Sequence, residues 1–330
     1  MSPVLPFDII TLIIDVVGEN EDTDLLKELA LVSHSFLQIC SKHLFATIEL
    51  DDACLSSKRG FVKLLKSRPE VVEYIRKLTY KLGDYNPNFL RSIPHLNCLI
   101  ITSSPRSSNV PDWKKLDPSL TSALLRLMHL PPIDHIEISY IQKFPLSSLI
   151  PCVNLLRLDI LYLGHDCDSF ETVPSEVMPK LREFRTTGSS LLAMKLLHAK
   201  LQDGRPAFNL MNLRRLSLFP EVFEDKSSIQ YLLQRAKLLE ELRLPDELGQ
   251  GTVGLHDNLS PTACTLKVLH LTMPFPPYGR VSPPTRLREE LEAMAGHNVL
   301  EDLTFESRWV KAIQRIALEL WVVYLTTGFL

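Results

Sequence analysis

One glycine pattern in the sequence is of the kind that binds nucleotide phosphates. Gly249, Gly251 and Gly254 match the GxGxxG spacing, in which glycine backbone lies close to a pyrophosphate. That chemistry requires a strand directly before the glycines and a helix directly after them, so that the pyrophosphate meets the helix N-terminus. Pro245 separates the glycines from the preceding apolar stretch, and the residues that follow, up to Pro261, are typical of a loop. We therefore expect a connecting loop, with a cofactor site as the alternative.

A second group of residues carries metal-ligating side chains: His165, Asp166, Cys167 and Asp168. Four consecutive positions converge on one ion only at a sharp turn, so we interpret the group as part of a solvated loop. The sequence has no GxSxG, Walker, HExxH or EF-hand pattern. We expect no catalytic residue, no cofactor and no bound metal.

The cysteines of the chain are scattered singly, without a CxxC pair. This distribution argues against a disulfide framework and against a structural zinc site. Cys98 and Cys264 have apolar neighbours in the sequence, and we predict that both are thiols in the core. The six cysteines are Cys40, Cys54, Cys98, Cys152, Cys167 and Cys264.

Charge and hydropathy give little support to nucleic acid or membrane as a partner. A formal net charge of -3 over 330 residues produces no strong field. The basic stretch at residues 58–68 interleaves cations with apolar residues at helical spacing, which predicts the solvated face of a helix; phosphate binding is the alternative. The acidic N-terminus fits neither a secretory signal nor a mitochondrial presequence. No stretch reaches the roughly 18 apolar residues that a membrane span needs, so we expect the cytoplasm, the nucleus or both.

The elements that must position any functional residue follow a repeat. Beyond residue 70 the pattern apolar-x-x-apolar-x-apolar recurs at intervals from 21 positions (Ile75 to Leu96) to 37 positions (Leu96 to Ile133). Most intervals contain an amphipathic helical pattern, such as residues 120–130 and 191–201. Strand followed by helix, repeated, predicts an α/β fold with a curved parallel sheet. The nine triplets are Ile75, Leu78, Tyr80; Leu96, Leu99, Ile101; Ile133, Ile136, Ile138; Leu155, Leu158, Ile160; Leu181, Phe184, Thr186; Leu213, Leu216, Leu218; Leu239, Leu242, Leu244; Leu266, Leu269, Leu271; and Leu300, Leu303, Phe305, with Leu320, Val323, Leu325 as a tenth.

Residues 1–48 have a different rhythm and predict three short helices. The first follows Pro6 and places Ile9, Ile13 and Val16 on one face. A polar, acidic loop separates it from a second, leucine-rich helix, and a third begins at about Ser33 or Ser35. A unit this small with so much apolar character should need a partner or the rest of the chain to cover it.

The N-terminal segment resembles an F-box. Residues 5–10, Leu-Pro-Phe-Asp-Ile-Ile, are similar to the opening motif Leu-Pro-x-Glu-Ile, and residues 25–33 resemble the leucine-rich run that ends in Val-Ser. Phe36 stands where the family usually has Trp, and His43-Leu44-Phe45 closes the segment as in many fungal members. The triplets resemble leucine-rich repeats that lack the usual Asn or Cys after the strand. The whole chain is similar to fungal F-box proteins with degenerate leucine-rich repeats.

This resemblance implies an F-box-like helical domain (1–48), a connecting helix or linker (49–70) and a solenoid of about nine to ten irregular leucine-rich repeats (71–330). It also implies that the F-box docks on the Skp-type adaptor of a cullin–RING ubiquitin ligase of the SCF type. The alternative is that the same residues form the internal core of a helical cap, and single residues could do both. The adaptor-binding residues carried over are Leu5, Pro6, Ile9, Ile13, Leu29, Val32 and Phe36.

Residues between the apolar positions of a strand share the opposite face of a parallel sheet. Their mixed charges predict contact with a polar protein surface, with a merely solvated face as the alternative. We therefore expect a substrate-recognition subunit of a ubiquitin ligase that binds an unknown protein and is not an enzyme. A repeat scaffold without ligase assembly is the second possibility, and an enzyme using the Gly249 loop is the third. The substrate-binding candidates are Arg157, Asp159, Glu183, Arg185, Arg215, Glu241, Arg243, His270 and Asp302.

Overall fold

The computed structural model describes residues 6–20, 22–50, 55–82, 87–104, 110–164, 178–188, 195–219, 232–245, 265–273 and 300–307. The chain divides into two compact units, residues 1–141 and 142–330. Several predictions fall outside the described residues and stay predictions. They concern Leu5, the group His165–Asp168, the glycines of Gly249–Gly254, Cys264 and the triplet at Leu320 to Leu325.

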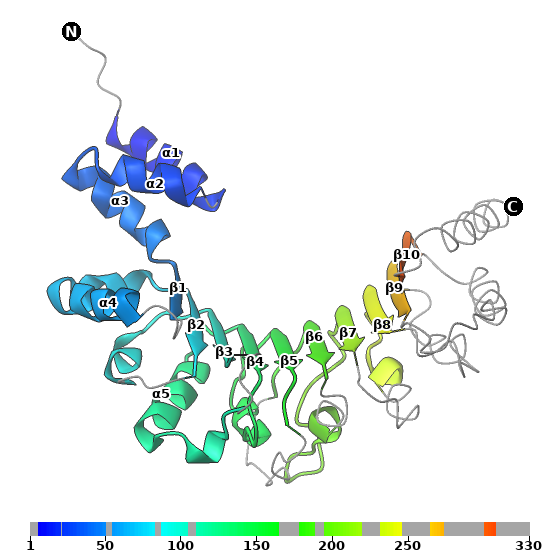
Figure 1. Ribbon diagram of the computed structural model, residues 1–330. Helices are drawn as coiled ribbons and strands as arrows, with labels where there is room; N and C mark the ends of the chain where they lie inside the picture. Colours follow the sequence, from blue (N-terminus) through cyan, green and yellow to red (C-terminus); the bar gives the residue numbers. More distant parts are fainter. Residues whose placement is uncertain are drawn as a thin grey trace, which may run out of the picture. The chain divides into compact units, whose positions relative to one another are not determined.

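Three helices open the first unit, as the sequence predicts: α1 (Phe7–Glu19), α2 (Thr23–Ala30) and α3 (His34–Leu44) (Figure 1). Pro6 precedes the first residue of α1, where a missing amide hydrogen costs nothing. Asp22 caps α2 by accepting a hydrogen bond from the Leu25 amide at 3.1 Å, and Ser33 caps α3 by accepting one from the Phe36 amide at 3.3 Å. Local side chains therefore fix where the second and third helices begin.

The three helices enclose a small core of their own. Ile14, Leu26, Ile39 and Cys40 are buried in it. The partly buried residues that pack against this core are Ile10, Val17, Leu29, Ala30, Phe36 and Leu44.

A polar contact also joins α1 to α3. The carboxylate of Asp15 lies 2.6 Å from Lys42 Nζ and 2.8 Å from His43 Nε2. These two partners hold the pKa of Asp15 below its usual value, Lys42 contributing most. The ring of His43 packs against Gly18, where an added Cβ would lie 2.2 Å from Nδ1. Glycine at this position lets the imidazole lie directly on the α1 backbone.

Four parallel strands follow in the first unit: β1 (Thr47–Leu50), β2 (Lys77–Lys81), β3 (Cys98–Thr102) and β4 (His135–Ser139). Each strand pairs with the next one along the chain, and Leu78, Leu99 and Ile136 form one buried row across them. The helical segments beside these strands are α4 (Leu55–Ser67), η1 (Pro69–Tyr74), η2 (Pro87–Ser92), η3 (Trp113–Lys115) and α5 (Pro118–Met128).

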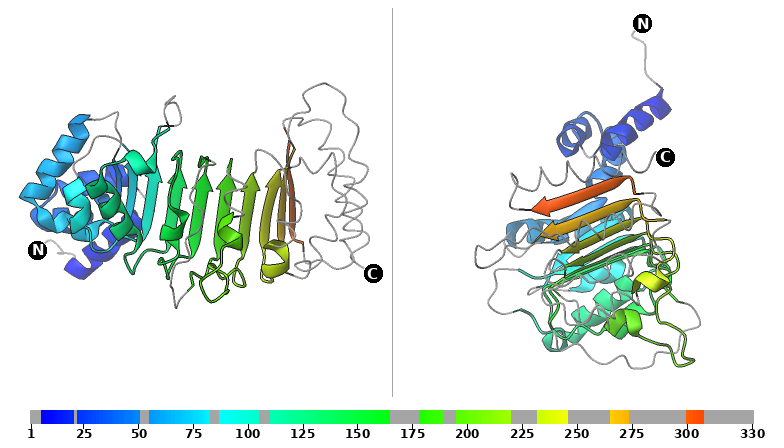
Figure 2. Two further views of the ribbon diagram at one scale, coloured as in Figure 1. Left: turned by 90° about the horizontal axis from the view of Figure 1, so that it is seen from below. Right: turned by 90° about the vertical axis from the view of Figure 1, so that its right-hand side faces the viewer.

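The second unit repeats the arrangement with strands β5 (Arg157–Leu161), β6 (Glu183–Thr187), β7 (Arg215–Phe219), β8 (Glu241–Pro245), β9 (Val268–Met273) and β10 (Asp302–Ser307). All are parallel and pair in chain order, so they stand side by side in Figures 1 and 2. Helix η4 (Leu146–Leu149) precedes β5. One apolar row crosses the sheet and is buried from β5 to β9: Leu158, Phe184, Leu216, Leu242 and Leu269.

Each of the nine predicted triplets forms a strand, and each strand begins two residues after the first residue of its triplet, as Lys77 follows Ile75. The α/β class with parallel strands is therefore confirmed. Strand β1 was not predicted, although Phe45, Ile48 and Leu50 have the triplet spacing. The first residue of that triplet, Phe45, directly follows the last residue of α3 and continues its apolar pattern.

The helices predicted between strands are only partly present. Helix α5 fills the interval of 37 positions between Leu96 and Ile133, as predicted for residues 120–130. The described part of the predicted helix at 191–201 is helical only at 195–198. Intervals of 21 and 22 positions, which begin at Ile75 and Ile133, contain the short 3₁₀ helices η2 and η4 instead. A short interval leaves no room for three α-helical turns beside two loops.

The prediction that Cys98 is a core thiol is wrong. Cys98 is the first residue of β3 and is partly exposed, whereas Leu99 and Ile101 are buried. Successive side chains of a strand point to opposite faces, so the burial of Leu99 directs Cys98 to the polar face. Its apolar neighbours in the sequence belong to the other side of the sheet.

Candidate functional site

The helical part of the first unit exposes large apolar side chains, which together form the apolar helical surface. Leu31 and Val32, in the turn after α2, are 88% and 64% exposed. The members on α1 are Phe7, Ile9, Leu12, Ile13 and Val16, and Leu25 of α2 is also exposed. A group of exposed apolar residues this large on one small unit is typical of a surface that binds another protein.

Helix α1 explains how this surface arises. Ile10, Ile14 and Val17 face the core of the three helices, while Ile9 and Ile13 face away from it and are exposed. A polar stripe that includes Asp8 and Asp15 runs along α1, and the rest of its circumference is apolar. The core covers only part of this apolar surface, and the remaining part stays exposed.

The predicted adaptor-binding residues divide into two groups. Pro6, Ile9, Ile13 and Val32 are exposed. Leu29 and Phe36 pack against the core of the three helices. The second group is therefore structural within the helices, and Leu5 lies outside the described residues.

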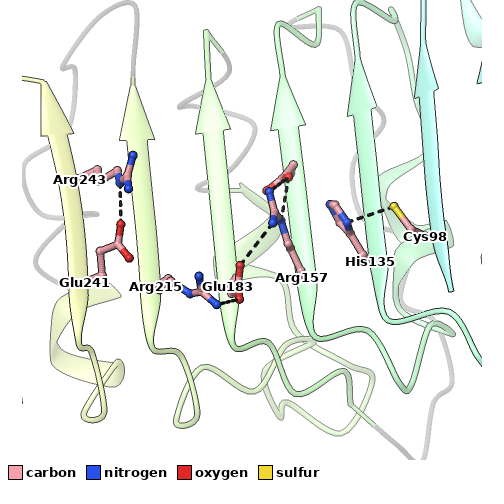
Figure 3. A network of polar contacts seen from close by, with 8 residues as sticks. Cys98, His135, Arg157, Glu183, Arg215, Glu241 and Arg243 are labelled. Atoms are coloured by element: carbon pink, nitrogen blue, oxygen red, sulfur yellow. Dashed lines mark hydrogen bonds and ion pairs between the residues drawn. The ribbon is translucent and has the colours of Figure 1, made fainter. Parts of the chain in front are cut away.

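The second candidate surface is the polar face of the sheet in the second unit, here called the charged ladder. It includes the nine predicted substrate-binding residues, which all lie on strands β5 to β10. The strand register places them in two rungs. Figure 3 shows part of this face, with Arg157, Glu183 and Arg215 on neighbouring strands. The first rung is Arg157, Glu183, Arg215, Glu241, Val268 and Asp302; the second is Asp159, Arg185, Ser217, Arg243, His270 and Thr304.

The first rung alternates in sign over four strands, and its charges pair. Glu183 accepts a hydrogen bond from Arg215 on one side and lies 3.7 Å from Arg157 on the other. Arg243 donates a hydrogen bond to Glu241 at 2.6 Å within the same strand. Opposite charges at directly opposed positions of neighbouring strands stabilise the register. The ladder thus neutralises most of its own charge.

Asp159 is the buried member of the ladder, with 2% of its side chain exposed. Arg157 lies over it and donates to Asp159 Oδ2 from Nε at 3.1 Å and from an Nη atom at 2.9 Å. A buried carboxylate is stable only when it is paired, so this arginine has a structural role as well as an exposed face.

Arg185 is the exception among the arginines of the ladder. Its side chain is exposed, and the described part of the chain gives it no hydrogen bond or ion pair. Its neighbours in the rung are Asp159, which Arg157 already engages, and Ser217. An arginine held in the open beside a hydroxyl can bind a carboxylate of another molecule in a bidentate manner.

Comparison with known proteins does not assign the chain to a family. No protein-family model matches it, and no curated protein matches it. One solved structure that it matches is the crystal structure of a Bacteroides fragilis protein determined as a structural-genomics target. The match has a TM-score of 0.36 and 12% sequence identity, and it covers 76% of this chain and 83% of the other.

Sequence reasoning missed several members of both surfaces. Phe7, Leu12 and Leu31 are exposed apolar residues that the motif-based set omits. The signal was that the apolar surface of α1 is wider than the side that packs on the core. Ser217 and Thr304 occupy ladder positions that the charge-based selection passed over.

Among the described helices, none is long and apolar enough to cross a membrane.

Proposed function

We propose that the chain is the substrate-recognition subunit of an SCF-type ubiquitin ligase, with an F-box formed by α1 to α3 and a degenerate leucine-rich-repeat solenoid formed by the strand units. The apolar helical surface docks on a Skp-type adaptor, and the charged ladder binds a protein substrate. The chain does no bond chemistry itself: it holds the substrate near a conjugating enzyme, in the cytoplasm, the nucleus or both.

The observation that carries this proposal is the exposed apolar side of α1 together with the turn at Leu31 and Val32. The three helices already have a core without these residues. Their exposure therefore costs solubility without helping the helices to fold, which fits a surface that is covered in a complex. The F-box motif assigns Ile9, Ile13 and Val32 to the adaptor, and all three are on this surface.

Burial of these apolar side chains against the adaptor supplies enough free energy for a stable complex. Full burial of one Leu, Ile or Val side chain stabilises by about 1.5–3 kcal/mol, so a half-exposed Ile such as Ile13 gains about 1 kcal/mol on being covered. A carboxylate introduced at such a position loses this gain and must also be desolvated. Two such substitutions together should weaken binding by at least about a hundredfold.

The test is co-purification with a fungal Skp-type adaptor. We expect stoichiometric capture by the wild type and loss of capture by an Ile9→Asp/Ile13→Asp variant. Met211→Asp is the matched control, since Met211 is an exposed apolar residue of the second unit. Capture should persist in that control. Failure of a folded wild type to capture the adaptor would contradict the ligase proposal.

A repeat scaffold that binds proteins without a ligase is the second candidate, because Leu29 and Phe36 pack inside the helices. That packing is what a helical cap requires. If the adaptor is not captured, the scaffold is the function that remains, with the charged ladder as its binding surface.

A further inference from the structure

Cys98 lies beside a histidine on the polar face of the first unit. Its Sγ atom is 3.2 Å from Nδ1 of His135, and the strand register places the two residues directly opposite each other on β3 and β4 (Figure 3). Both side chains are partly exposed. A thiol and an imidazole at hydrogen-bond distance form a nucleophile and a base, provided that Nδ1 is the unprotonated nitrogen.

The other neighbour of Cys98 in the same rung is a cation. Lys77 of β2 is in register with Cys98 and is exposed. The described part of the chain gives Lys77 no ion pair or hydrogen bond. The rung of Cys98 thus carries a lysine on one neighbouring strand and a histidine on the other.

The remaining charged groups on this face of β1 to β4 lie outside that rung. Glu137 is two residues beyond His135 on β4, and one of its carboxylate oxygens lies within 4.8 Å of a ring nitrogen of His135. Glu49 of β1 lies 3.8 Å from Lys81 of β2, which offsets its charge. The groups that face Cys98 from both adjacent strands in its own rung are thus basic.

The other described cysteines have the opposite surroundings. Cys40 is buried in the core of the three helices, and burial raises the pKa of its thiol. Cys152 is also buried, which raises the pKa of its thiol to about 12. Both thiols stay protonated near neutral pH and are closed to reagents. Among these three cysteines, Cys98 alone is partly exposed and has a base within reach.

We propose that Cys98 is a modification site that exchanges with small-molecule disulfides, with His135 as its base. His135 takes the proton of the thiol, and the thiolate sulfur of Cys98 attacks one sulfur of the disulfide. A new sulfur–sulfur bond forms as the old one breaks, and the second sulfur leaves as a thiolate that receives the proton from His135. The products are a mixed disulfide at Cys98 and one free thiol.

Modification changes the polar face of the first unit. With glutathione disulfide the added group is a charged tripeptide, attached between Lys77 and His135 on neighbouring strands. A protein that contacts this face would be displaced, and reduction by a free thiol would restore the contact. The reactivity of Cys98 does not depend on adaptor binding.

The experiment treats the full-length native chain with glutathione disulfide and measures adducts by intact mass spectrometry and mapping of each cysteine-containing peptide. The first adduct should form at Cys98, at least about a hundredfold faster than at Cys40 or Cys152. Cys98→Ser should lose that fast adduct. Slow modification of Cys98, at the rate of the urea-unfolded chain, would overturn the proposal.

Two variants test whether the reactivity of Cys98 depends on its neighbours or on its exposure alone. His135→Gln should slow the reaction at pH 7 by about tenfold, since the base is removed while an amide remains. Lys77→Gln, at an exposed position that tolerates substitution, should slow the reaction by less. A rate at pH 7 unchanged in both variants would show that exposure alone governs Cys98.

Discussion

The helical part of the first unit and the sheet of the second unit present opposite kinds of surface. The helices expose apolar side chains, with Leu31 and Val32 the most exposed among them. The sheet exposes charged side chains, and most of these are already paired with one another in the charged ladder. The apolar helical surface stays exposed to solvent, while most charges of the charged ladder are paired with one another.

The two surfaces therefore suit different kinds of binding. An apolar surface gains free energy from any complementary partner that removes water, with little dependence on salt. A self-paired charged surface gains little from burial and selects a partner by the placement of opposite charges. Stable docking fits the helices, and selective recognition fits the sheet.

The largest expected effect separates the inner and outer sides of α1. Ile14→Ala should destabilise the helices by about 2–5 kcal/mol, because Ile14 is buried in their core. Ile13→Ala should change stability by less than about 0.5 kcal/mol, since the side chain is half exposed. Hydrogen exchange of the α1 and α3 amides measures both. Equal losses would mean that the outer side of α1 contributes to folding.

Removal of Arg157 tests how far the ladder serves its own fold. Arg157→Met should cost about 1–3 kcal/mol, because the buried carboxylate of Asp159 loses the two hydrogen bonds that Arg157 donates. Arg215→Met should cost less than about 1 kcal/mol, since this arginine is exposed and its pairing is screened by water. Urea unfolding followed by circular dichroism compares them. A double variant, Arg157→Met/Asp159→Asn, should recover part of the loss; no recovery would rule out the buried charge as the cause.

Gly18→Ala should destabilise the helices by about 1 kcal/mol, since the new Cβ displaces the His43 ring and its hydrogen bond to Asp15. Gly60→Ala in α4 is the matched control, because nothing lies within 4 Å of an added Cβ there. That substitution should stabilise by up to about 1 kcal/mol through helix propensity alone. Thermal unfolding of both variants gives the comparison, and a stabilising Gly18→Ala would contradict the packing of His43.

The smallest expected effect is a pH dependence. The pKa of Asp15 is lowered in the folded state, mainly by Lys42 and then by His43, so its contribution is complete above pH 3.8 and is lost as the pH falls through the folded-state pKa. Asp15→Asn should therefore be less stable than the wild type at pH 6 and should lose less stability on acidification. Glu28→Gln, at an exposed position of α2, is the control. An identical acid response in wild type and Asp15→Asn would refute the assignment.

The strands and the ladder could be predicted because a repeat constrains them. The first residue of a triplet, such as Leu96 or Leu213, is buried in every triplet except the ninth, where Leu300 is partly exposed, and this regular burial is visible in the sequence. Alternation along a strand then places Arg157 and Asp159 on one face without further information. The choice of partner within that face was not predictable. Arg157 faces Glu183 across the sheet and Asp159 along its own strand, and side-chain packing decides that it engages both.

The exposed side of α1 and the surroundings of Cys98 could not be predicted in the same way. A helix with a wide apolar surface, as at Ile9, Ile10, Ile13 and Ile14, does not reveal which part of that surface its own core covers. Cys98 sits between Asn97 and Leu99, and sequence neighbours of a strand residue lie on the opposite face. His135 reaches it only through strand pairing across 37 positions. Long-range contacts of this kind have no local signature.

The alternating signs of Arg157, Glu183, Arg215 and Glu241 restrict how the array can grow during evolution. Duplication of a single unit would place a second Glu183 beside the first, or a second Arg215 beside the first, and like charges directly opposite each other destabilise a sheet. Duplication of two consecutive units preserves the alternation at every new junction. Repeats in this part of the sheet should therefore be gained or lost in pairs. Whether the number of strands is odd or even should then stay the same through evolution.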